Sequence, residues 1–240
     1  MITDRFKLTG KTALITGAGK GIGRGIAIAF AEMGANVVCV ARTEADVAEV
    51  AAEAEKFGVR ALAVTCDVTS EAALQALVKQ VEETFGGLDI LVNNAGAPGK
   101  GYGSLAKVDK ARFEHTIDIN LTSAYVLTHL ALPLLKASPS ARIVNVSSAL
   151  AWMVDRNFAA YAAAKAGMNQ MTKVMAYELA PKIRVNAIAP VLSKPPVPLS
   201  LPKMKKCSPI PPAGFRCSAW ANLKISRWRH STLHRMPATS

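Results

Sequence analysis

A tyrosine and a lysine four residues apart are the side chains of this chain best suited to acid–base chemistry. Tyr161 and Lys165 lie in a segment rich in helix formers. Residues at i and i+4 share one helix face, with Cβ atoms about 5–6 Å apart. A nearby ammonium favours phenolate, so we expect Lys165 to lower the pKa of Tyr161 from its ordinary value near ~10. Such a phenol can give a proton to a carbonyl oxygen or take one from an alcohol.

A serine hydroxyl precedes this helix. Ser148 ends the apolar run over residues 142–148, and its hydroxyl could hold the same substrate oxygen as Tyr161. Tyrosine and lysine at helical spacing also occur on ordinary surface helices. Whether Tyr161 and Lys165 can act together in catalysis therefore depends on the helices and strands that position them.

The chain up to Pro190 alternates short β-rich runs with helical stretches. We expect strands over 12–16, 36–41, 61–68, 88–96, 142–148 and 183–190. We expect helices over 21–34, 44–58, 70–86 and 109–136, and a further helix that carries Tyr161 and Lys165 and continues through 166–180. This alternation is typical of an α/β fold in which helices cover both faces of a parallel sheet. A ligand crevice is then expected where the strands end, at one edge of the sheet.

A glycine-rich segment joins the first expected strand to the first helix. Glycines at this point permit a tight turn and a close backbone approach, and the helix N-terminus favours a pyrophosphate. After the first strand of a βαβ series, the segment predicts dinucleotide binding. The expected cofactor-binding residues are Gly17, Gly19, Lys20, Gly21, Ile22 and Gly23.

The second expected strand ends in Ala41-Arg42-Thr43. NAD binders usually carry an acid at this point for the ribose hydroxyls, whereas an arginine suits a 2′-phosphate. Lys20 adds a second positive charge nearby. We therefore predict NADP(H) as the cofactor. NAD(H) is the alternative, in which Arg42 is only a solvated surface residue.

Two further strand ends supply candidate cofactor contacts. Asp67 and Val68 close the third expected strand, and Asp67 could either reach the adenine or cap the next helix. Asn94, Ala95 and Gly96 close the fourth expected strand. Small and amide residues there would pack a turn against the cofactor, and a plain turn is the alternative.

Together, these motifs resemble the short-chain dehydrogenase/reductase family. The matching segments are Thr16-Gly17-x3-Gly21-x-Gly23, Asn93-Asn94-Ala95-Gly96, Asn120 after Asp118-Ile119, Ser148-x12-Tyr161-x3-Lys165 and Arg184-Val-Asn-Ala-Ile-Ala-Pro190. The resemblance implies a Rossmann-type three-layer sandwich and a nicotinamide cofactor. It also implies hydride transfer that interconverts a secondary alcohol and a ketone.

The same resemblance implies roles for single residues. Tyr161 would be the proton donor or acceptor, and Lys165 would lower its pKa. Both would also contact the cofactor, Lys165 through the nicotinamide ribose. Ser148 would position and polarise the carbonyl group. Asn120 would hold a water that links Lys165 to solvent.

The expected substrate cavity is apolar or mixed in character. Its candidate lining is the loop 97–103 with Trp152, Met153 and Phe158, and core or interface packing is the alternative for Trp152 and Met153. The resemblance is greatest to bacterial hydroxysteroid dehydrogenase-like and 3-oxoacyl reductase-like members. The sequence does not choose between these small-molecule substrates.

Charge divides the chain near Pro190. Residues 191–240 hold 9 of the 29 Lys and Arg residues and no Asp or Glu. Such a basic segment could bind nucleic acid or a membrane surface. It shows no amphipathic period, so we expect neither partner.

Other features indicate a cytoplasmic protein. The N-terminus is polar, and no apolar run approaches the length of a membrane span. Cys39 and Cys66 fall in expected strand ends, where buried reduced thiols are common. The cysteines show no metal-ligand spacing, so we expect no metal site.

The segment after Pro190 departs from the family. In the family, the proline that corresponds to Pro190 belongs to the cofactor site. A glycine, three variable residues and a threonine follow it. Here the chain continues Val191-Leu-Ser-Lys-Pro195. If a single base is restored before the codons for these residues, the new reading frame can encode the family's glycine and threonine at the expected positions. We therefore predict a Rossmann-type domain over 1–190, and we interpret 191–240 as a basic, proline-rich, frameshifted terminus that is poorly ordered.

This interpretation has consequences for function. The family's seventh strand, its substrate lid and part of an oligomer interface would be lost, although the resemblance implies a homodimer or homotetramer. Two functional hypotheses follow. One is an NADP(H)-dependent oxidoreductase, and the alternative is an impaired relative that binds nucleotide without turnover.

Overall fold

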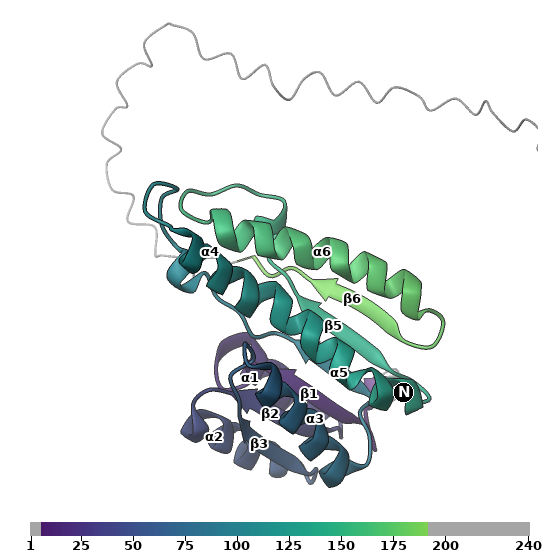
Figure 1. The fold of residues 1–240 in the computed structure, drawn as a ribbon. Helices are drawn as coiled ribbons and strands as arrows, with labels where there is room; N and C mark the ends of the chain where they lie inside the picture. The colour runs from purple at the N-terminus through teal and green to yellow at the C-terminus, as the bar shows by residue number, and fades with distance from the viewer. Residues whose placement is uncertain (1–5, 192–240) are drawn as a thin grey trace, which may run out of the picture. The chain divides into compact units, whose positions relative to one another are not determined.

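A parallel sheet forms the centre of the described structure. The computed structural model describes residues 6–191, so the interpretation of the segment from 192 to 240 lies outside the described residues. The strands are β1 (Thr12–Thr16), β2 (Asn36–Ala41), β3 (Ala61–Thr65), β4 (Ile90–Asn93), β5 (Arg142–Val146) and β6 (Arg184–Ile188). They form one sheet in the order β3-β2-β1-β4-β5-β6, and every pair is parallel (Figure 1). The predicted α/β fold with six parallel strands is confirmed.

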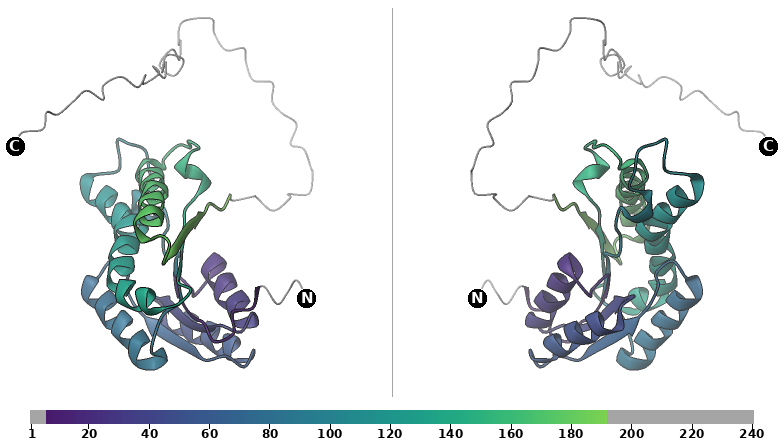
Figure 2. Two further views of the ribbon diagram at one scale, coloured as in Figure 1. Left: turned by 90° about the vertical axis from the view of Figure 1, so that its right-hand side faces the viewer. Right: turned by 90° about the vertical axis from the view of Figure 1, so that its left-hand side faces the viewer.

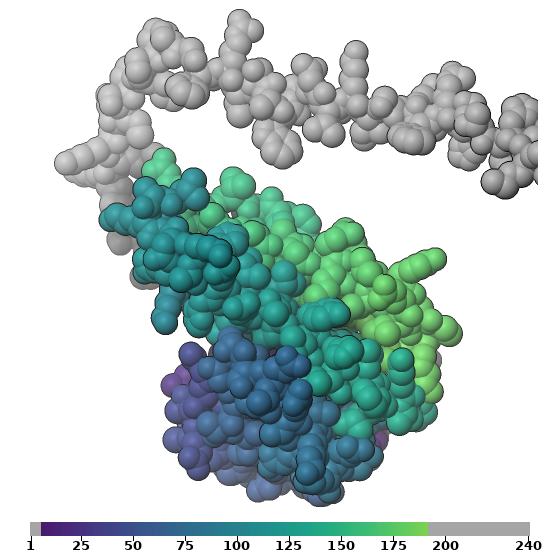
Figure 3. Space-filling view, viewed as in Figure 1, coloured from purple at the N-terminus to yellow at the C-terminus, as the bar shows by residue number. Residues whose placement is uncertain are grey.

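Helices cover both faces of this sheet. They are α1 (Gly21–Glu32), α2 (Glu44–Glu55), α3 (Glu71–Phe85), α4 (Lys110–Ile117), α5 (Ser123–Ala137) and α6 (Ala159–Leu179). One core cluster joins the sheet to α3, α5 and α6, and a second joins it to α1 and α2 (Figure 2). Side chains of the segments that form α3, α5 and α6 cover the face turned toward the viewer in Figure 3. The three-layer arrangement predicted from the sequence is therefore confirmed.

The strand order places a crevice beside β1. After β3 the chain crosses back, and β4 pairs with β1 on the side opposite β2. Thr16 is level with Val40, and Ile15 is level with Val92. The loops after β1, β2 and β4 therefore leave the sheet at one edge. In open α/β sheets, ligands bind at such a switch point.

Four predicted strands are too long at their carboxyl ends. β3 ends at Thr65, β4 at Asn93, β5 at Val146 and β6 at Ile188. The residues that follow turn out of the sheet and line the crevice. Ser147 keeps one backbone hydrogen bond to Ile188 at 2.7 Å. Cys66 keeps one backbone hydrogen bond to Ala41, and the chain then turns.

The predicted helix over 109–136 is interrupted. α4 and α5 are separated by a π-helical turn at Asp118–Thr122. Such turns are rare and often accompany functional sites. Asn120 lies in this turn and is fully buried.

β6 is an edge strand of the described sheet. Val185 is buried beneath α6, whereas Asn186 and Ile188 are exposed. Ile188 keeps 42% of its surface exposed, which is high for a strand isoleucine. The described residues therefore leave this part of the sheet partly uncovered.

Both described cysteines are buried and free. Burial raises the pKa of the Cys39 thiol to about 12. The prediction of reduced core thiols is confirmed for Cys39 and Cys66. Within residues 6–191, no helix has the length and apolar character that crossing a membrane requires.

Candidate active site

Two cavities open at the carboxyl ends of the strands and share Gly96. The Arg42 cavity, of about 230 Å³, is lined by residues that follow β1, β2, β3 and β4. The Tyr161 cavity, of about 360 Å³, lies against β5, the start of α6 and Pro190. Their shared residue indicates one continuous crevice.

The structure brings most predicted site residues to this crevice. Those lining the Arg42 cavity are Gly17, Gly19, Lys20, Arg42, Asp67, Val68, Ala95 and Gly96. Those lining the Tyr161 cavity are Ile22, Asn94, Gly96, Ser148, Tyr161, Lys165 and Pro190. Gly21, Gly23 and Asn120 line neither cavity.

The glycine loop fits the role of a nucleotide cradle. Gly17 has φ +66°, and a Cβ on it would lie 2.8 Å from Asn94 Nδ2. A Cβ on Gly23 would collide with the carbonyl oxygen of Gly17. Without these glycines, α1 could not begin so close to the end of β1. Its N-terminus faces the crevice, as pyrophosphate binding requires.

Thr16 fastens the loop after β4 to the end of β1. Its Oγ1 accepts hydrogen bonds from the backbone N–H groups of Asn94 and Ala95, both at 3.0 Å. Asn94 Nδ2 donates to the carbonyl oxygen of Thr16 at 2.8 Å. The predicted turn is thus rigidly attached to the glycine loop. Thr16 itself was not predicted as a site residue, because its role depends on a contact distant in sequence.

Asp67 does two things that the sequence left open. Its Oδ1 accepts hydrogen bonds from the backbone and hydroxyl of Thr69, which lower the pKa of the Asp67 carboxyl. Asp67 also lines the Arg42 cavity. The N-cap of α3 is Ser70, which accepts a hydrogen bond from Ala73 N. Asp67 therefore shapes the turn before the helix and does not cap it.

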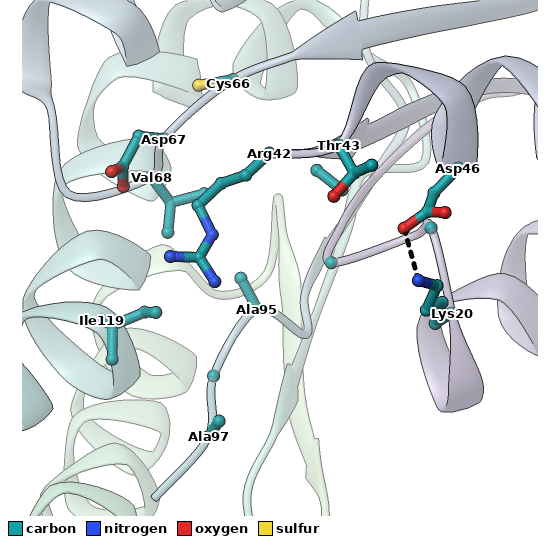
Figure 4. A pocket seen from close by; sticks show the side chains of 14 residues that line it. Lys20, Arg42, Thr43, Asp46, Cys66, Asp67, Val68, Ala95, Ala97 and Ile119 are labelled. Carbon is teal, nitrogen blue, oxygen red and sulfur yellow. Dashed lines mark ion pairs between the residues drawn. The ribbon is translucent and has the colours of Figure 1, made fainter. Parts of the chain in front are cut away.

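Two cations face the Arg42 cavity (Figure 4). Arg42 extends between Val68 and Ala95, whereas Lys20 lies on the other side of the cavity and pairs with Asp46 at 3.0 Å. Asp46 was not singled out from the sequence, because a helical acid usually marks a solvated face. Its position four residues after Arg42 gave no local signal of contact with the glycine loop.

Tyr161 and Lys165 share a helix face, but they do not interact as predicted. Lys165 is only 2% exposed, and its Nζ donates to the carbonyl oxygen of Val146 at 2.8 Å. Nζ lies 5.6 Å from the centre of the Tyr161 ring. Burial raises the pKa of Tyr161, and a hydrogen bond with Ser148 partly opposes this. The predicted lowering of this pKa by Lys165 is therefore wrong for this structure, because desolvation of the phenolate dominates.

Burial shifts the pKa of Lys165 in the opposite direction to that of Tyr161. Removing the ammonium from water disfavours its charged form and lowers the pKa of Lys165 to about 8. Lys165 consequently holds a proton near neutral pH but releases it more readily than a surface lysine.

The neighbouring serines have different partners. Ser148 lines the Tyr161 cavity and hydrogen-bonds Tyr161. Ser147 is buried, and its Oγ donates to the carbonyl oxygen of Lys165 at 3.3 Å. The geometry thus favours Ser148 as the group that meets a substrate oxygen.

An aromatic wall adjoins the tyrosine. The Phe158 ring lies edge-on to Tyr161, with centroids 6.2 Å apart, and Tyr102 packs edge-on against Phe158 at 5.0 Å. Pro98, Met153 and Phe158 line the Tyr161 cavity, as predicted for the substrate side. Trp152 does not line it and is 70% exposed, so Trp152 is neither part of this lining nor a core residue. Packing of Trp152 at an interface stays a prediction.

Asn120 lies below Gly96 with one unsatisfied atom. Its Nδ2 donates to the carbonyl oxygens of Ala97 (2.8 Å) and Thr116 (2.9 Å), while its buried Oδ1 has no hydrogen-bond partner. A Cβ on Gly96 would collide with this oxygen and lie 3.3 Å from Lys165 Nζ. An orphaned buried acceptor beside an ammonium suits a bound water.

A buried amide chain behind the site was missed in the sequence. Asn93 Nδ2 donates to Asn145 Oδ1 at 2.9 Å, and Asn145 Nδ2 donates to Thr172 Oγ1 at 2.9 Å. These bonds join β4, β5 and α6 below Ser148 and Lys165. The available signal was asparagine inside the apolar run Arg142–Val146.

The described site fits a nicotinamide dinucleotide. The glycine cradle, the basic Arg42 cavity and the Tyr161 cavity are adjacent and connected through Gly96. In the described part of the chain, no group of three or more His, Cys, Asp or Glu residues could hold a metal ion. The fold and site define a dinucleotide-binding α/β oxidoreductase.

Sequence comparison identifies the family. A family model described as short chain dehydrogenase matches residues 11–204. The chain therefore belongs to the short-chain dehydrogenase family. Its relatives include the 7alpha-hydroxysteroid dehydrogenase of Escherichia coli (strain K12), 40% identical over 190 residues, which are 78% of this chain and 73% of the relative. The D-beta-hydroxybutyrate dehydrogenase of Cupriavidus necator is 39% identical over 184 residues, 76% of this chain and 70% of the relative.

Solved structures agree with this family. A 7α-hydroxysteroid dehydrogenase complexed with NADH and 7-oxo glycochenodeoxycholic acid superposes with a TM-score of 0.74 and 38% identity, over 78% of this chain and 72% of that chain. An NAD+-bound xylitol dehydrogenase superposes with a TM-score of 0.73 and 34% identity, over 77% and 71%. The chain is similar to dehydrogenases that act on CH–OH groups with nicotinamide cofactors.

Proposed function

We propose that this protein is an NADP(H)-dependent oxidoreductase that interconverts a secondary alcohol and a ketone. The observation that carries the proposal is the placement of Ser148 and Tyr161 in a cavity that meets the Arg42 cavity at Gly96. A reacting carbon in the Tyr161 cavity would thus lie beside a bound dinucleotide. The nicotinamide, when bound, would supply or accept the hydride.

The protein's own residues would handle the proton. Because burial raises the pKa of Tyr161, its phenol is protonated at neutral pH and can donate to the oxygen of a ketone during reduction. Ser148 would hold that oxygen by a hydrogen bond. In alcohol oxidation the phenol oxygen would take the proton instead, and the nearby Lys165 ammonium would stabilise the resulting phenolate.

Lys165 and Asn120 would return the proton to solvent. The pKa of Lys165 near 8 lets it exchange protons close to neutral pH. The unsatisfied Oδ1 of Asn120 offers a site for a water beside it. We propose that Tyr161, Lys165 and this water form the proton path, with Asn120 as a positioning residue.

The preference for NADP(H) rests on charge. Arg42 and Lys20 both line the cavity, and a guanidinium can bind a phosphate through two hydrogen bonds. The similar structures carry NADH or NAD+, so the preference is specific to the residues of this chain.

The substrate class follows from the cavity lining. Leu150, Met153 and Phe158 present apolar surface beside Tyr161. We propose an apolar secondary alcohol or ketone, either of the hydroxysteroid kind or a 3-oxoacyl derivative. The buried free thiols suit a reducing compartment, so we also propose that the protein is cytoplasmic. We further propose a homo-oligomer, as the family resemblance implies.

A replacement of Tyr161 by phenylalanine tests the reaction. With NADPH and a panel of apolar ketones, Tyr161→Phe should lose at least about 100-fold in turnover, the scale of general acid catalysis. NADPH affinity should change little, because only a hydroxyl is lost. Tyr102→Phe removes a hydroxyl from the same aromatic wall and should retain turnover. Substantial turnover by the Tyr161 variant would refute the assignment.

The impaired relative is the second candidate. The chain spans 73% of its hydroxysteroid dehydrogenase relative, and its sequence departs from the family pattern after Pro190. Nucleotide binding without turnover of any ketone in the panel would favour this candidate. Resequencing the gene tests the proposed frameshift, which fails if no single-base restoration yields a family-like C-terminus.

A further inference from the structure

The charges that line the Arg42 cavity are balanced. Among the described lining residues, two are basic (Lys20 and Arg42) and two are acidic (Asp46 and Asp67). Lys20 Nζ is paired with Asp46 Oδ2 at 3.0 Å, while Arg42 extends toward the side of the cavity where Asp67 and Val68 lie (Figure 4). A site built only for an anion would not place a carboxylate on one of its two cations.

The position of Asp46 is built into the fold. It lies in the first turn of α2, where the partial positive charge of the helix N-terminus favours a carboxylate. A Cβ on Gly19 would lie 2.9 Å from the Cβ of Asp46. The missing side chain at Gly19 therefore lets the helix bring this carboxylate against the glycine loop, within reach of Lys20.

We propose that Asp46 sets the cofactor specificity of this site by competing with a 2′-phosphate for Lys20. The inference rests on the proposed use of NADP(H) and concerns how strongly that cofactor is preferred. While Lys20 is paired, the 2′-phosphate gains less from its charge and is repelled by the Asp46 carboxylate. The binding of NAD(H) is weakened less by the pairing of Lys20 and by the charge of Asp46, because the ribose hydroxyls of NAD(H) carry no charge.

The Lys20–Asp46 ion pair is weak enough for a bound phosphate to compete with Asp46 for Lys20. The Lys20 side chain is 79% exposed and that of Asp46 is 23% exposed. Exposed ion pairs are weak and exchange partners readily. Lys20 can therefore be shared with a bound phosphate, so the pair reduces the preference without abolishing it.

Replacement of Asp46 by asparagine tests this proposal in the full chain. The dissociation constants of NADPH and NADH are measured by titration for the wild type and for Asp46→Asn. The ratio of NADPH affinity to NADH affinity should rise by roughly five-fold, the scale of one partly exposed charge pair. NADH affinity itself should change by less than about two-fold on the same reasoning.

Glu44 provides a matched control. It lies in the same first turn of α2 but does not line the cavity. Glu44→Gln removes the same charge from the same helix end, so it reproduces any loss of helix stability and any long-range electrostatic effect. An equal rise in the affinity ratio for the Glu44 variant would overturn the proposal.

A double variant tests whether Lys20 is the link. In a Lys20→Ala background, Asp46→Asn should raise the affinity ratio by clearly less than in the wild type, because only the direct repulsion by Asp46 is then removed. A full five-fold rise there would show simple repulsion by Asp46 and would overturn the competition.

An Arg42→Ala variant separates this proposal from the proposed cofactor. NADP(H) would be refuted as the cofactor if the wild type binds NADH more tightly than NADPH and the Arg42→Ala variant has the same two affinities. The comparison of Asp46→Asn with Glu44→Gln would still decide the role of Asp46. Normal nucleotide binding with an unchanged ratio in Asp46→Asn would overturn only the inference about Asp46.

Discussion

At the scale of single residues, burial controls the chemistry of the site. Lys165 and Tyr161 lie four residues apart on α6, where Lys165 is buried and Tyr161 is partly buried. Desolvation disfavours the ammonium of Lys165 and the phenolate of Tyr161, so it lowers the pKa of Lys165 and raises the pKa of Tyr161. The two pKa values therefore move apart, and the Lys165 ammonium is the more acidic of the two groups.

Lys165 should make the stability of the protein depend on pH. Its pKa is about 8 in the folded state against 10.5 for the exposed group, so between these values the unfolded chain binds more protons. Stability then rises with pH across this window. Relative to Lys165→Met, the wild type should gain up to about 3 kcal/mol between pH 8 and 10.5, since one pKa unit is worth about 1.4 kcal/mol.

Urea denaturation across this pH range measures the effect. Lys173→Met is the control, because Lys173 is exposed on the same helix. Its stability should follow the wild type at every pH. Parallel curves for the wild type and Lys165→Met would contradict a strongly desolvated ammonium.

At the scale of elements, the site depends on how strand ends are joined. Thr16 at the end of β1 donates to the carbonyl oxygen of Val92 at 3.3 Å and accepts from Asn94 N and Ala95 N. The π-turn between α4 and α5 brings Asn120 beneath Gly96. Both devices hold loops that would otherwise have no regular backbone partners.

Loss of the Thr16 hydroxyl should loosen the crevice. Thr16→Val keeps the shape of the side chain but leaves two backbone N–H groups without their acceptor. We expect a loss of about 1–3 kcal/mol of stability in urea denaturation, the cost of unsatisfied polar groups. NADPH binding should weaken as well, because the glycine loop loses its tie to the loop after β4.

Thr16→Ser separates the hydroxyl from the methyl group. Serine retains Oγ, so its NADPH affinity should stay close to that of the wild type. Equal affinity and stability in the valine and serine variants would show that the hydroxyl does not position the loops.

At the scale of the whole molecule, the described sheet ends in an exposed strand. Ile188 and Asn186 of β6 lie open among the described residues, whereas β1 is buried along its whole length. An open edge weakens a sheet and favours association with other chains. Ligand binding at the crevice should add to the stability of the folded chain.

A thermal-shift scan of the 240-residue chain tests this expectation together with the cofactor preference. A ligand at 100 times its dissociation constant adds about 2.7 kcal/mol, which corresponds to roughly 5–10 °C in Tm for a chain of this size. NADPH should raise Tm more than NADH at equal concentration. A larger shift with NADH would contradict the reading of Arg42, and no cooperative transition would show that the chain does not fold stably by itself.

The sequence by itself determined the parts of this protein that depend on local patterns. The strands Thr12–Thr16 and Asn36–Ala41, the glycine loop and the shared helix face of Tyr161 and Lys165 follow from periodicity and residue type over a few neighbours. The tertiary structure decided what those side chains touch. Lys20 meets Asp46, Thr16 holds Asn94, and Lys165 turns to Val146 because crossovers bring distant segments together. The pKa of Tyr161 depends on burial as well as on its nearest charge, and burial exists only once the helices have packed on the sheet.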